Sequence, residues 1–323
     1  MNRAHSGAAT GNYLLLPNPW IPSRSRFQLS SVRWYMQEGD LRIRIGHSPD
    51  PDDAFMFHAL TCGSFETAGR NYEHVLHDIE ALNQHALEGK YEISAVSIHS
   101  FPSIADKYHL MNCGGSMGEG YGPMLISNSA LSIEEAKEKV IAIPGLGTSA
   151  YLALRLACGD VQVEVVPFDQ IIPRVLEGEY DVGLIIHEGQ LTWANEGVHM
   201  VLDLGLWWNE RTGLPLPLGG NVVRKNLGDE ICEQLTADVR RSIMHSLNDP
   251  VTALEFAKKW GRGIDEETNK EFVRMYVNQR TVDYGADGRR AIRMFLGEGQ
   301  DIGLIPEDLD CSNLKFIGSG IDG

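Results

Sequence analysis

The chain has 323 residues, enough for one large domain or two ordinary ones, and its 43% hydrophobic content is normal for a globular protein. Its net charge of −16 argues against nucleic acid and anionic membranes as partners, although a locally positive site could still bind an anionic small molecule. No apolar run approaches the roughly 18 residues of a membrane span, and the five scattered cysteines favour reduced thiols in the cytoplasm over a disulfide framework.

Residues 1–40 differ in composition from the rest, because they contain three prolines and no helical or strand periodicity. The apolar run at 13–16 stops at Pro17, well short of the roughly 7–15 residues that the core of a signal peptide requires. We therefore expect this segment to be disordered or an over-extended start, with Met36 as a hypothetical initiator.

The first clear element is a strand at 41–46, followed by a proline-containing turn and a helix at 54–60. The acids of the turn, Asp50, Asp52 and Asp53, could form a magnesium site or could cap the orphan amides of the helix and complement its dipole. Capping is the favoured interpretation, since no further cluster of oxygen ligands lies nearby in the sequence.

A second helix is predicted from its N-cap Asp78 to Leu87, before a buried strand at 91–98. This passage recurs at a constant offset of 89 residues in the segment 176–185, and more loosely at 297–305. Each copy is predicted to be a helix that ends at a glycine, then a short turn and a buried strand.

The initial strand, turn and helix also have a counterpart at 139–157. Because the whole unit occurs twice, the sequence indicates two similar α/β lobes. The glycine-rich stretch 114–123 suits a crossover between them, or a wall where backbone approaches a ligand closely. The irregular stretch 212–220 would return the chain to the first lobe.

These two connecting stretches set the predicted domain boundaries. Residues 41–126 together with 221–323 form lobe one, and residues 127–220 form lobe two. Three helices near the end of the chain are expected to pack on lobe one, at 231–247, 251–260 and 267–278.

The strand predicted at 180–186 ends in His187. Its apolar, β-branched composition is typical of a strand that is buried on both faces, and ligands of open α/β sheets bind at the carboxyl ends of such strands. A neutral imidazole held there can accept a proton near neutral pH, so His187 is a candidate general base. A core or helix-capping histidine is the alternative.

The segment 144–150 matches the dinucleotide fingerprint G-x-G-x-x-A between a strand and a helix, and Glu164 follows where a ribose-binding acid is expected. However, the hydroxyls of Thr148 and Ser149 are not needed in a pyrophosphate loop. We favour a helix N-terminus that presents backbone amides and these two hydroxyls to a carboxylate. A dinucleotide site and plain helix capping remain alternatives.

Ser97 ends its strand in lobe one as His187 ends its strand in lobe two. Its hydroxyl could donate to a substrate oxygen or satisfy local backbone groups. No Ser-His-Asp set, Cys-x-x-Cys pair or zinc-like cluster is visible, so neither a metal nor another cofactor is expected.

Four segments with distinctive motifs occur in order, at 48–53, 118–123, 183–188 and 213–220. Together they resemble the 1,4-dihydroxy-6-naphthoate synthases of the futalosine route to menaquinone, over roughly residues 41–300. The resemblance implies an α/β fold of the type 2 periplasmic-binding-protein-like class, with two lobes and the ligand in the cleft between them. It also implies a lyase that converts cyclic dehypoxanthinylfutalosine to 1,4-dihydroxy-6-naphthoate with loss of a dihydroxyacetone unit.

The resemblance further implies that His187 is the catalytic base. The substrate-binding residues that we expect, at a strand end and a helix start, are Ala95, Val96, Ser97, Thr148, Ser149 and Ala150. Many family members have a lysine in place of Ala95, and Cys-Pro-Asn-Asp in place of residues 50–53. We interpret these departures as the mark of a subgroup.

The function expected is that of a cytoplasmic, cofactor-independent enzyme whose partner is a small aromatic carboxylate. The oligomeric state stays open, with a homodimer as one option. Two alternatives share the fold: a small-carboxylate solute-binding protein, against which the absence of an export signal counts, and chorismate dehydratase. A nicotinamide-dependent dehydrogenase is the third alternative.

Overall fold

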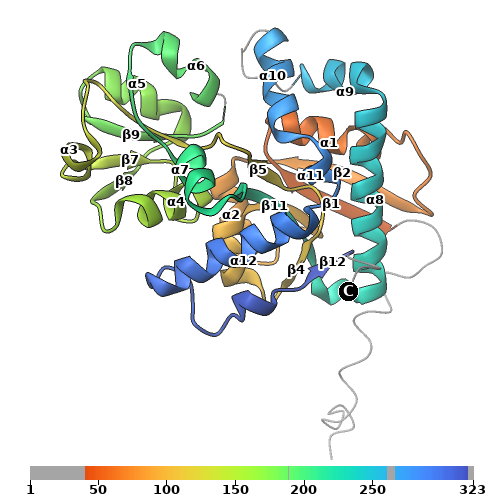
Figure 1. Cartoon of the computed structure of the whole chain (residues 1–323). Coiled ribbons are helices and arrows are strands. Elements are labelled where there is room, and N and C mark those ends of the chain that lie inside the picture. The colour runs from red at the N-terminus through yellow and green to blue at the C-terminus, as the bar shows by residue number, and fades with distance from the viewer. Residues whose placement is uncertain (1–40, 188, 260–265, 319–323) are drawn as a thin grey trace, which may run out of the picture. The chain divides into compact units, whose positions relative to one another are not determined.

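Two β-sheets, of seven and five strands, organise the part of the protein that its computed structural model describes, which is residues 41–187, 189–259 and 266–318 (Figure 1). The expectation for residues 1–40 lies outside the described residues. Within the described ranges, no helix has both the length and the apolar composition needed to cross a membrane.

The first sheet has the strand order β12-β4-β11-β3-β1-β2, and β5 also pairs with β11. Its centre is a parallel unit in which helices connect successive strands: β1 (Leu41–His47), α1 (Pro51–Thr61), β2 (Arg70–Leu76), α2 (Ile79–Leu87) and β3 (Ile93–Ser97). The remaining strands are β4 (Tyr108–Met111), β5 (Ser116–Gly118), β11 (Leu216–Arg224) and β12 (Phe316–Ile317).

The second sheet has the order β10-β6-β9-β7-β8 and the same kind of centre. Its parallel unit is β7 (Ile141–Ile143), α4 (Ser149–Cys158), β8 (Val163–Val165), α5 (Ile171–Leu176) and β9 (Val182–Ile185). Strand β6 (Met124–Ser127) pairs antiparallel with β9 and with β10 (His199–Asp203), as β11 pairs antiparallel with β3.

The two sheets therefore repeat one arrangement, β3-β1-β2 in the first and β9-β7-β8 in the second. The first residues of β3 and β9, Ile93 and Val182, are separated by the offset of 89 residues seen in the sequence. The two-lobed α/β fold is confirmed. The residue numbers at which the lobes divide remain a prediction.

The helices of the last third cover the first sheet, as predicted. They are α8 (Asp229–Asn248), α9 (Pro250–Ala257), α10 (Glu266–Tyr276), α11 (Gln279–Val282) and α12 (Gly285–Asp301). Figure 1 shows α8, α9 and α10 beside α1, and their apolar side chains share one core with those of α1 and β1. Helix α1 is buried over almost its whole length because it lies between these layers.

The short helices of the second lobe are α3 (Ile133–Lys137), α6 (Gly189–Glu196) and α7 (Leu204–Thr212).

Predicted capping is confirmed at α2, where the Asp78 carboxylate accepts the Ala81 N–H at 2.9 Å. The short 3₁₀ segments are η1 (Ile98–Ile104), η2 (Phe168–Gln170), η3 (Lys225–Leu227) and η4 (Cys311–Asn313).

Two sequence predictions are wrong. The third copy of the repeat is not a helix, turn and strand, because α12 continues through Gly297 and Gly299 and residues 302–305 form turns and bends. The second half of the stretch 212–220 is not irregular, since Leu216 begins strand β11. Proline is tolerated there because β11 shifts register between Pro217 and Gly219 as it pairs with β5.

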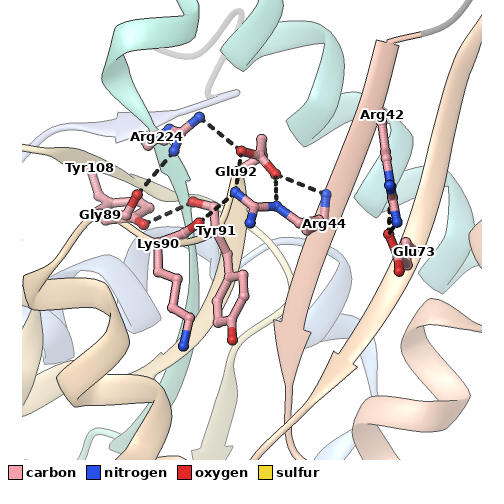
Figure 2. Close-up of polar contacts among 9 residues, drawn as sticks. All are labelled: Arg42, Arg44, Glu73, Gly89, Lys90, Tyr91, Glu92, Tyr108 and Arg224. Atoms are coloured by element: carbon pink, nitrogen blue, oxygen red, sulfur yellow. Dashed lines mark hydrogen bonds and ion pairs between the residues drawn. The ribbon is translucent and has the colours of Figure 1, made fainter.

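A buried carboxylate at the residue just before β3 links that strand to β1 and β11 of the first sheet (Figure 2). Glu92 accepts hydrogen bonds from Arg44 on β1 and from Arg224 on β11, at 2.9 and 2.8 Å. Burial acts to raise the pKa of Glu92, but the hydrogen bonds from Arg44 and the charge of Arg224 outweigh it and leave that pKa below its ordinary value. The stabilisation is therefore present above the ordinary carboxyl pKa and is lost as the pH falls through the lowered one.

We predict that Glu92→Gln lowers the free energy of unfolding by roughly 1.5–3 kcal/mol, because charge-assisted hydrogen bonds to two arginines are lost in a buried place. Chemical denaturation at neutral pH measures this. The matched control is Glu73→Gln, whose partner Arg42 is exposed, as is Glu73 itself, so a loss of less than about 1 kcal/mol is expected. Equal losses in the two variants would contradict the prediction.

A second polar contact joins β1 to β2. The His47 ring accepts a hydrogen bond from Nδ1 of His74 through its Nε2, because its own Nδ1 donates to the Ser48 carbonyl at 2.7 Å. Burial lowers the pKa of His47 to about 4. Burial, together with the neighbouring His47, lowers the pKa of His74 to about 3.

We predict an acid-sensitive stability from this histidine pair. In the unfolded chain both rings bind protons below about pH 6.5, whereas the folded protein keeps them neutral down to about pH 4. Stability is thus full above pH 6.5 and falls by about 1.4 kcal/mol per pH unit per histidine below it. Denaturation curves from pH 7 to 4.5 measure the slope. His74→Gln, which can still donate to His47, should show a shallower slope, and an unchanged slope would refute this origin.

Candidate active site

A cavity lies between the two sheets, and all seven residues predicted for the site line it. They come from the end of β3 (Ala95, Val96, Ser97), the start of α4 (Thr148, Ser149, Ala150) and the end of β9 (His187). The volume is about 110 Å³, well below the roughly 300–1,000 Å³ of typical small-molecule sites. An aromatic ligand of the size that the resemblance implies would need the walls to move apart.

His187 occupies a constrained position at the end of β9. Its backbone has φ of 55°, in the left-handed region that a non-glycine residue rarely adopts. Its Nδ1 lies 3.1 Å from a carboxylate oxygen of Asp50, and the edge of its ring meets Phe168 at a centroid distance of 5.0 Å. The side chain is 20% exposed, so it is held in place but still accessible from the cavity.

Gln190 fixes this backbone conformation. Its N–H donates to the His187 carbonyl at 3.1 Å. In the orientation that satisfies both ends of its side-chain amide, the oxygen accepts the His187 N–H at 3.2 Å and the nitrogen donates to the Gly122 carbonyl at 2.7 Å. The Tyr276 hydroxyl of α10 lies 2.9 Å from the same amide. Both α10 and the crossover that precedes β6 therefore support the turn at His187.

The three acids at the start of α1 have different partners. Asp50 is the N-cap residue, but its side chain makes no capping bond and pairs with His187. The Asp53 carboxylate accepts the N–H and the hydroxyl of Ser48, each at 2.8 Å. The backbone N–H groups of Asp52 and Asp53 act to lower the pKa of the Asp52 carboxyl, against the larger effect of burial. Side-chain capping by the N-cap residue Asp50 is therefore wrong, whereas Asp52 and Asp53 lie in the first turn, where acids complement the helix dipole as expected.

Burial also changes the protonation of these acids. It raises the pKa of Asp53 to about 6, against the opposing effect of Ser48. Burial and the charges of Asp53 and Asp50 raise the pKa of Asp52 well above its ordinary value. Among the described residues, no three His, Cys, Asp or Glu side chains are arranged to hold a metal ion.

At the start of α4, the structure separates the amides from the hydroxyls. The Thr148 hydroxyl donates to the Gly145 carbonyl and accepts the Tyr151 N–H, at 2.8 and 3.2 Å. The Ser149 hydroxyl is also engaged by the protein, so the expectation that both hydroxyls face a carboxylate is wrong. The amides of Ser149 and Ala150 are the first two of the helix, which have no intrahelical acceptor. They are the groups that can bind an anion.

Ser149 links α4 to the first sheet. Its hydroxyl donates to the Leu218 carbonyl on β11 at 2.6 Å and accepts the His99 N–H at 3.2 Å. Its role is thus to clamp a helix of one sheet to a strand of the other.

The two glycines of the predicted dinucleotide fingerprint also lie where α4 and its preceding turn pack against the first lobe. A Cβ on Gly145 would lie 2.4 Å from the Glu80 carboxylate, and one on Gly147 would lie 2.7 Å from the Ser100 hydroxyl. Ser100 also donates to the Gly147 carbonyl at 2.8 Å. Side chains of the first lobe therefore occupy the space that a pyrophosphate would need, which disfavours the dinucleotide interpretation.

Ser97 meets the protein through Asn83, whose side chain donates to the Ser97 hydroxyl at 3.2 Å and accepts its N–H at 2.9 Å. A hydroxyl that accepts in this way keeps its own hydrogen for donation. Ala95 and Val96 pair with β11 as part of the sheet and line the cavity beside it. Both original interpretations of Ser97 therefore stay open.

The sequence analysis did not identify the apolar residues that line one part of the cavity. Its residues come from segments far apart in the chain: Met56, Ile79, Pro123, Ile186, Leu218, Phe272 and Tyr276. Of the residues that line the cavity in the described part of the chain, none is Lys or Arg. The amphipathic pattern of 267–278 gave the helix of Phe272 and Tyr276, but no local signal shows which end of it meets the cavity.

We predict that Ser149→Ala destabilises the ligand-free protein by roughly 1–3 kcal/mol, because the buried His99 N–H and the Leu218 carbonyl both lose a partner. Denaturation without ligand measures the loss, and Ser129→Ala at an exposed serine is the control. A hydroxyl that served only to bind ligand would leave the ligand-free stability unchanged.

Comparisons with known proteins agree with this geometry. A family model described as menaquinone biosynthesis matches residues 43–301. The 1,4-dihydroxy-6-naphthoate synthase of Thermus thermophilus is 39% identical over 263 residues, which cover 81% of this chain and 95% of the relative. The enzyme of that name from Streptomyces coelicolor is 33% identical over 270 residues, covering 82% and 95%.

Solved structures agree as well. A crystal structure of a protein from Archaeoglobus fulgidus is 43% identical, with a TM-score of 0.78, and covers 82% of this chain and 98% of that one. The alkanesulfonate-binding protein of Xanthomonas axonopodis pv. citri shares the fold at 12% identity and a TM-score of 0.63, over 85% and 98% of the two chains. The chain belongs to the menaquinone-biosynthesis family, on a two-lobed periplasmic-binding-protein-like fold.

Proposed function

We propose that the protein is a carbon–carbon lyase that converts cyclic dehypoxanthinylfutalosine to 1,4-dihydroxy-6-naphthoate and dihydroxyacetone, with His187 as general base. The observation that carries the proposal is the placement of His187, which lines the cavity on a backbone that Gln190 holds in a left-handed conformation. Non-glycine residues in such conformations cluster at functional sites. The two curated relatives bear the name of this synthase.

The chemistry asks for a base that works near neutral pH, and a neutral imidazole has one nitrogen that can accept a proton. His187 would remove the substrate proton whose loss starts carbon–carbon cleavage. A base of this kind contributes about 10²–10⁴-fold in rate, and fixed geometry in the cavity would supply much of the rest.

The substrate carboxylate needs a positive partner, and the cavity is lined by three acids, at positions 50, 52 and 53. The backbone amides of Ser149 and Ala150 meet this need, since the N-terminus of α4 carries a partial positive charge. Helix α4 has no acid in its first turn that would compete for these amides. We therefore assign the carboxylate end of the substrate to α4.

The aromatic part of the substrate needs apolar surface, which Met56, Leu218 and Phe272 would provide. Because residues of both sheets close the cavity, binding would exclude water from the reacting groups. The small volume of the cavity fits a closed state from which the walls open to exchange ligand.

The test is incubation of the purified protein with cyclic dehypoxanthinylfutalosine, followed by mass spectrometry for 1,4-dihydroxy-6-naphthoate. We predict product from the unaltered protein and at least about a hundredfold less from His187→Ala, which is the low end of the general-base contribution. His199→Ala, at an exposed histidine on β10, is the matched control and should retain full activity.

Other results would overturn parts of the proposal. Equal product from the unaltered protein and His187→Ala would keep the lyase and remove His187 as its base. Consumption of chorismate in a parallel incubation, with no turnover of the futalosine derivative, would assign the sister dehydratase activity. Tight binding of a carboxylate without turnover of either compound would indicate a solute-binding protein.

A further inference from the structure

We infer that Asp50 is a positioning residue for His187: its carboxylate accepts the Nδ1 proton of the ring and so leaves Nε2 as the basic nitrogen. The inference deepens the proposed function and rests on it for the role of His187 as a base. Asp50 itself need not touch the substrate.

The first argument is geometry. The carboxylate oxygen of Asp50 lies 3.1 Å from Nδ1 of His187, and the Asp50 side chain is only 2% exposed. The Asp50 N–H is bound to the Ser48 hydroxyl at 3.3 Å, and its carbonyl accepts the first helical N–H of α1, from Ala54, at 3.0 Å. The acceptor is therefore attached to a fixed helix start.

The second argument is the tautomer. A neutral imidazole carries its proton on one nitrogen and a lone pair on the other. An ionised carboxylate has no proton to donate, so Nδ1 must be the protonated nitrogen at this contact. Phe168 packs against the same ring in a T-shaped arrangement, so the ring is held by one contact from each lobe. Nε2 then carries the lone pair, and it is the nitrogen that remains for a substrate proton.

The third argument is the location of charge among the titratable groups that share this cavity. Asp50 is the N-cap of α1, Asp52 and Asp53 lie in its first turn, and Tyr276 comes from α10. Phe168 and Gln190 add no charge. Burial raises the pKa of Asp53 to about 6 and that of Asp52 well above its ordinary value, and the charge of Asp50 contributes to both shifts. Of the three acids, Asp50 is the one whose carboxylate meets the His187 ring.

The proton inventory of the step is simple. Nε2 takes one proton from the substrate, and the Nδ1 proton stays on the ring, hydrogen-bonded to Asp50. The ring becomes an imidazolium beside a carboxylate, and Asp50 is not itself protonated. In a water-poor cavity such a fixed opposite charge stabilises the imidazolium more than it would in water.

The kinetic test is Asp50→Asn. The amide nitrogen of asparagine can donate to Nδ1, which favours the wrong tautomer, while the size of the side chain is kept. We predict that kcat falls at least tenfold, but by less than the roughly 10²–10⁴-fold loss expected for removal of the base itself, and that KM changes little. The acidic limb of the profile of kcat/KM against pH should move to lower pH, because the imidazolium loses its carboxylate.

The matched control is Asp78→Asn, the same substitution at the N-cap of α2, where asparagine is an equally good cap. It should leave kcat and the pH profile unchanged. A double-mutant cycle adds a sharper test, because a residue that acts only through His187 has no effect once His187 is alanine. Asp50→Asn in the His187→Ala background should therefore cost nothing further. A full additional loss would overturn the inference.

A measurement without substrate separates this inference from the proposed function. In ¹⁵N spectra of the histidine rings, the signals lost in His187→Ala identify that ring. We expect protonated Nδ1 and unprotonated Nε2 in the unaltered protein, and a change of this pattern in Asp50→Asn. A protonated Nε2 in the unaltered protein, or no change in the variant, would overturn the inference even if the lyase activity holds. The expected pattern without turnover would sink only the proposed function.

Discussion

The site depends on one constrained backbone, that of His187. A left-handed conformation at a non-glycine residue costs about 1–3 kcal/mol, so it persists only where neighbours hold it. Gln190 does so with hydrogen bonds on both sides of the residue. Because the Gln190 amide is bound in turn to Gly122 and Tyr276, the crossover between the sheets and helix α10 both determine where the imidazole lies.

The duplicated β-α-β unit explains why the two ends of the cavity differ in charge. In each sheet the helix after the first strand of the unit begins at the cavity: α1 follows β1 and α4 follows β7. The start of α1 contains Asp52 and Asp53, whereas the first turn of α4 contains no acid. The N-terminus of α1 is therefore surrounded by carboxylates, whereas the N-terminus of α4 presents backbone amides with no acid in the first turn of the helix. On the proposed function, this difference would favour one orientation of an anionic substrate, with its carboxylate toward α4.

The sequence predicted the elements whose residues follow a local periodicity. It did not predict the side-chain partners that only the tertiary structure brings together. His187 could be predicted as a site residue because a buried strand ends there. The two-lobed fold could be predicted because the β-α-β unit occurs twice in the sequence. The pairing of Asp50 with His187 had no local signal, since the two residues belong to different sheets. Thr148 illustrates the same limit: its place at a helix start was predictable, but not that Gly145 and Tyr151 engage its hydroxyl. The third repeat failed because α12 packs as one continuous helix.

Contacts between the lobes also affect the state of the protein in which His187, the proposed base, is oriented by Asp50. Asp50 follows a strand of one sheet and His187 follows a strand of the other. The hydrogen bond between Ser149 and Leu218 likewise joins α4, which follows a strand of the second sheet, to β11 of the first. A movement that separates the two sheets around the cavity would lengthen both contacts. On the proposed function, closure around the substrate would re-form the Asp50–His187 pair in the step that excludes water. The proposed base would then be oriented only in the closed, water-poor cavity, and the orientation of the imidazole would follow from ligand binding.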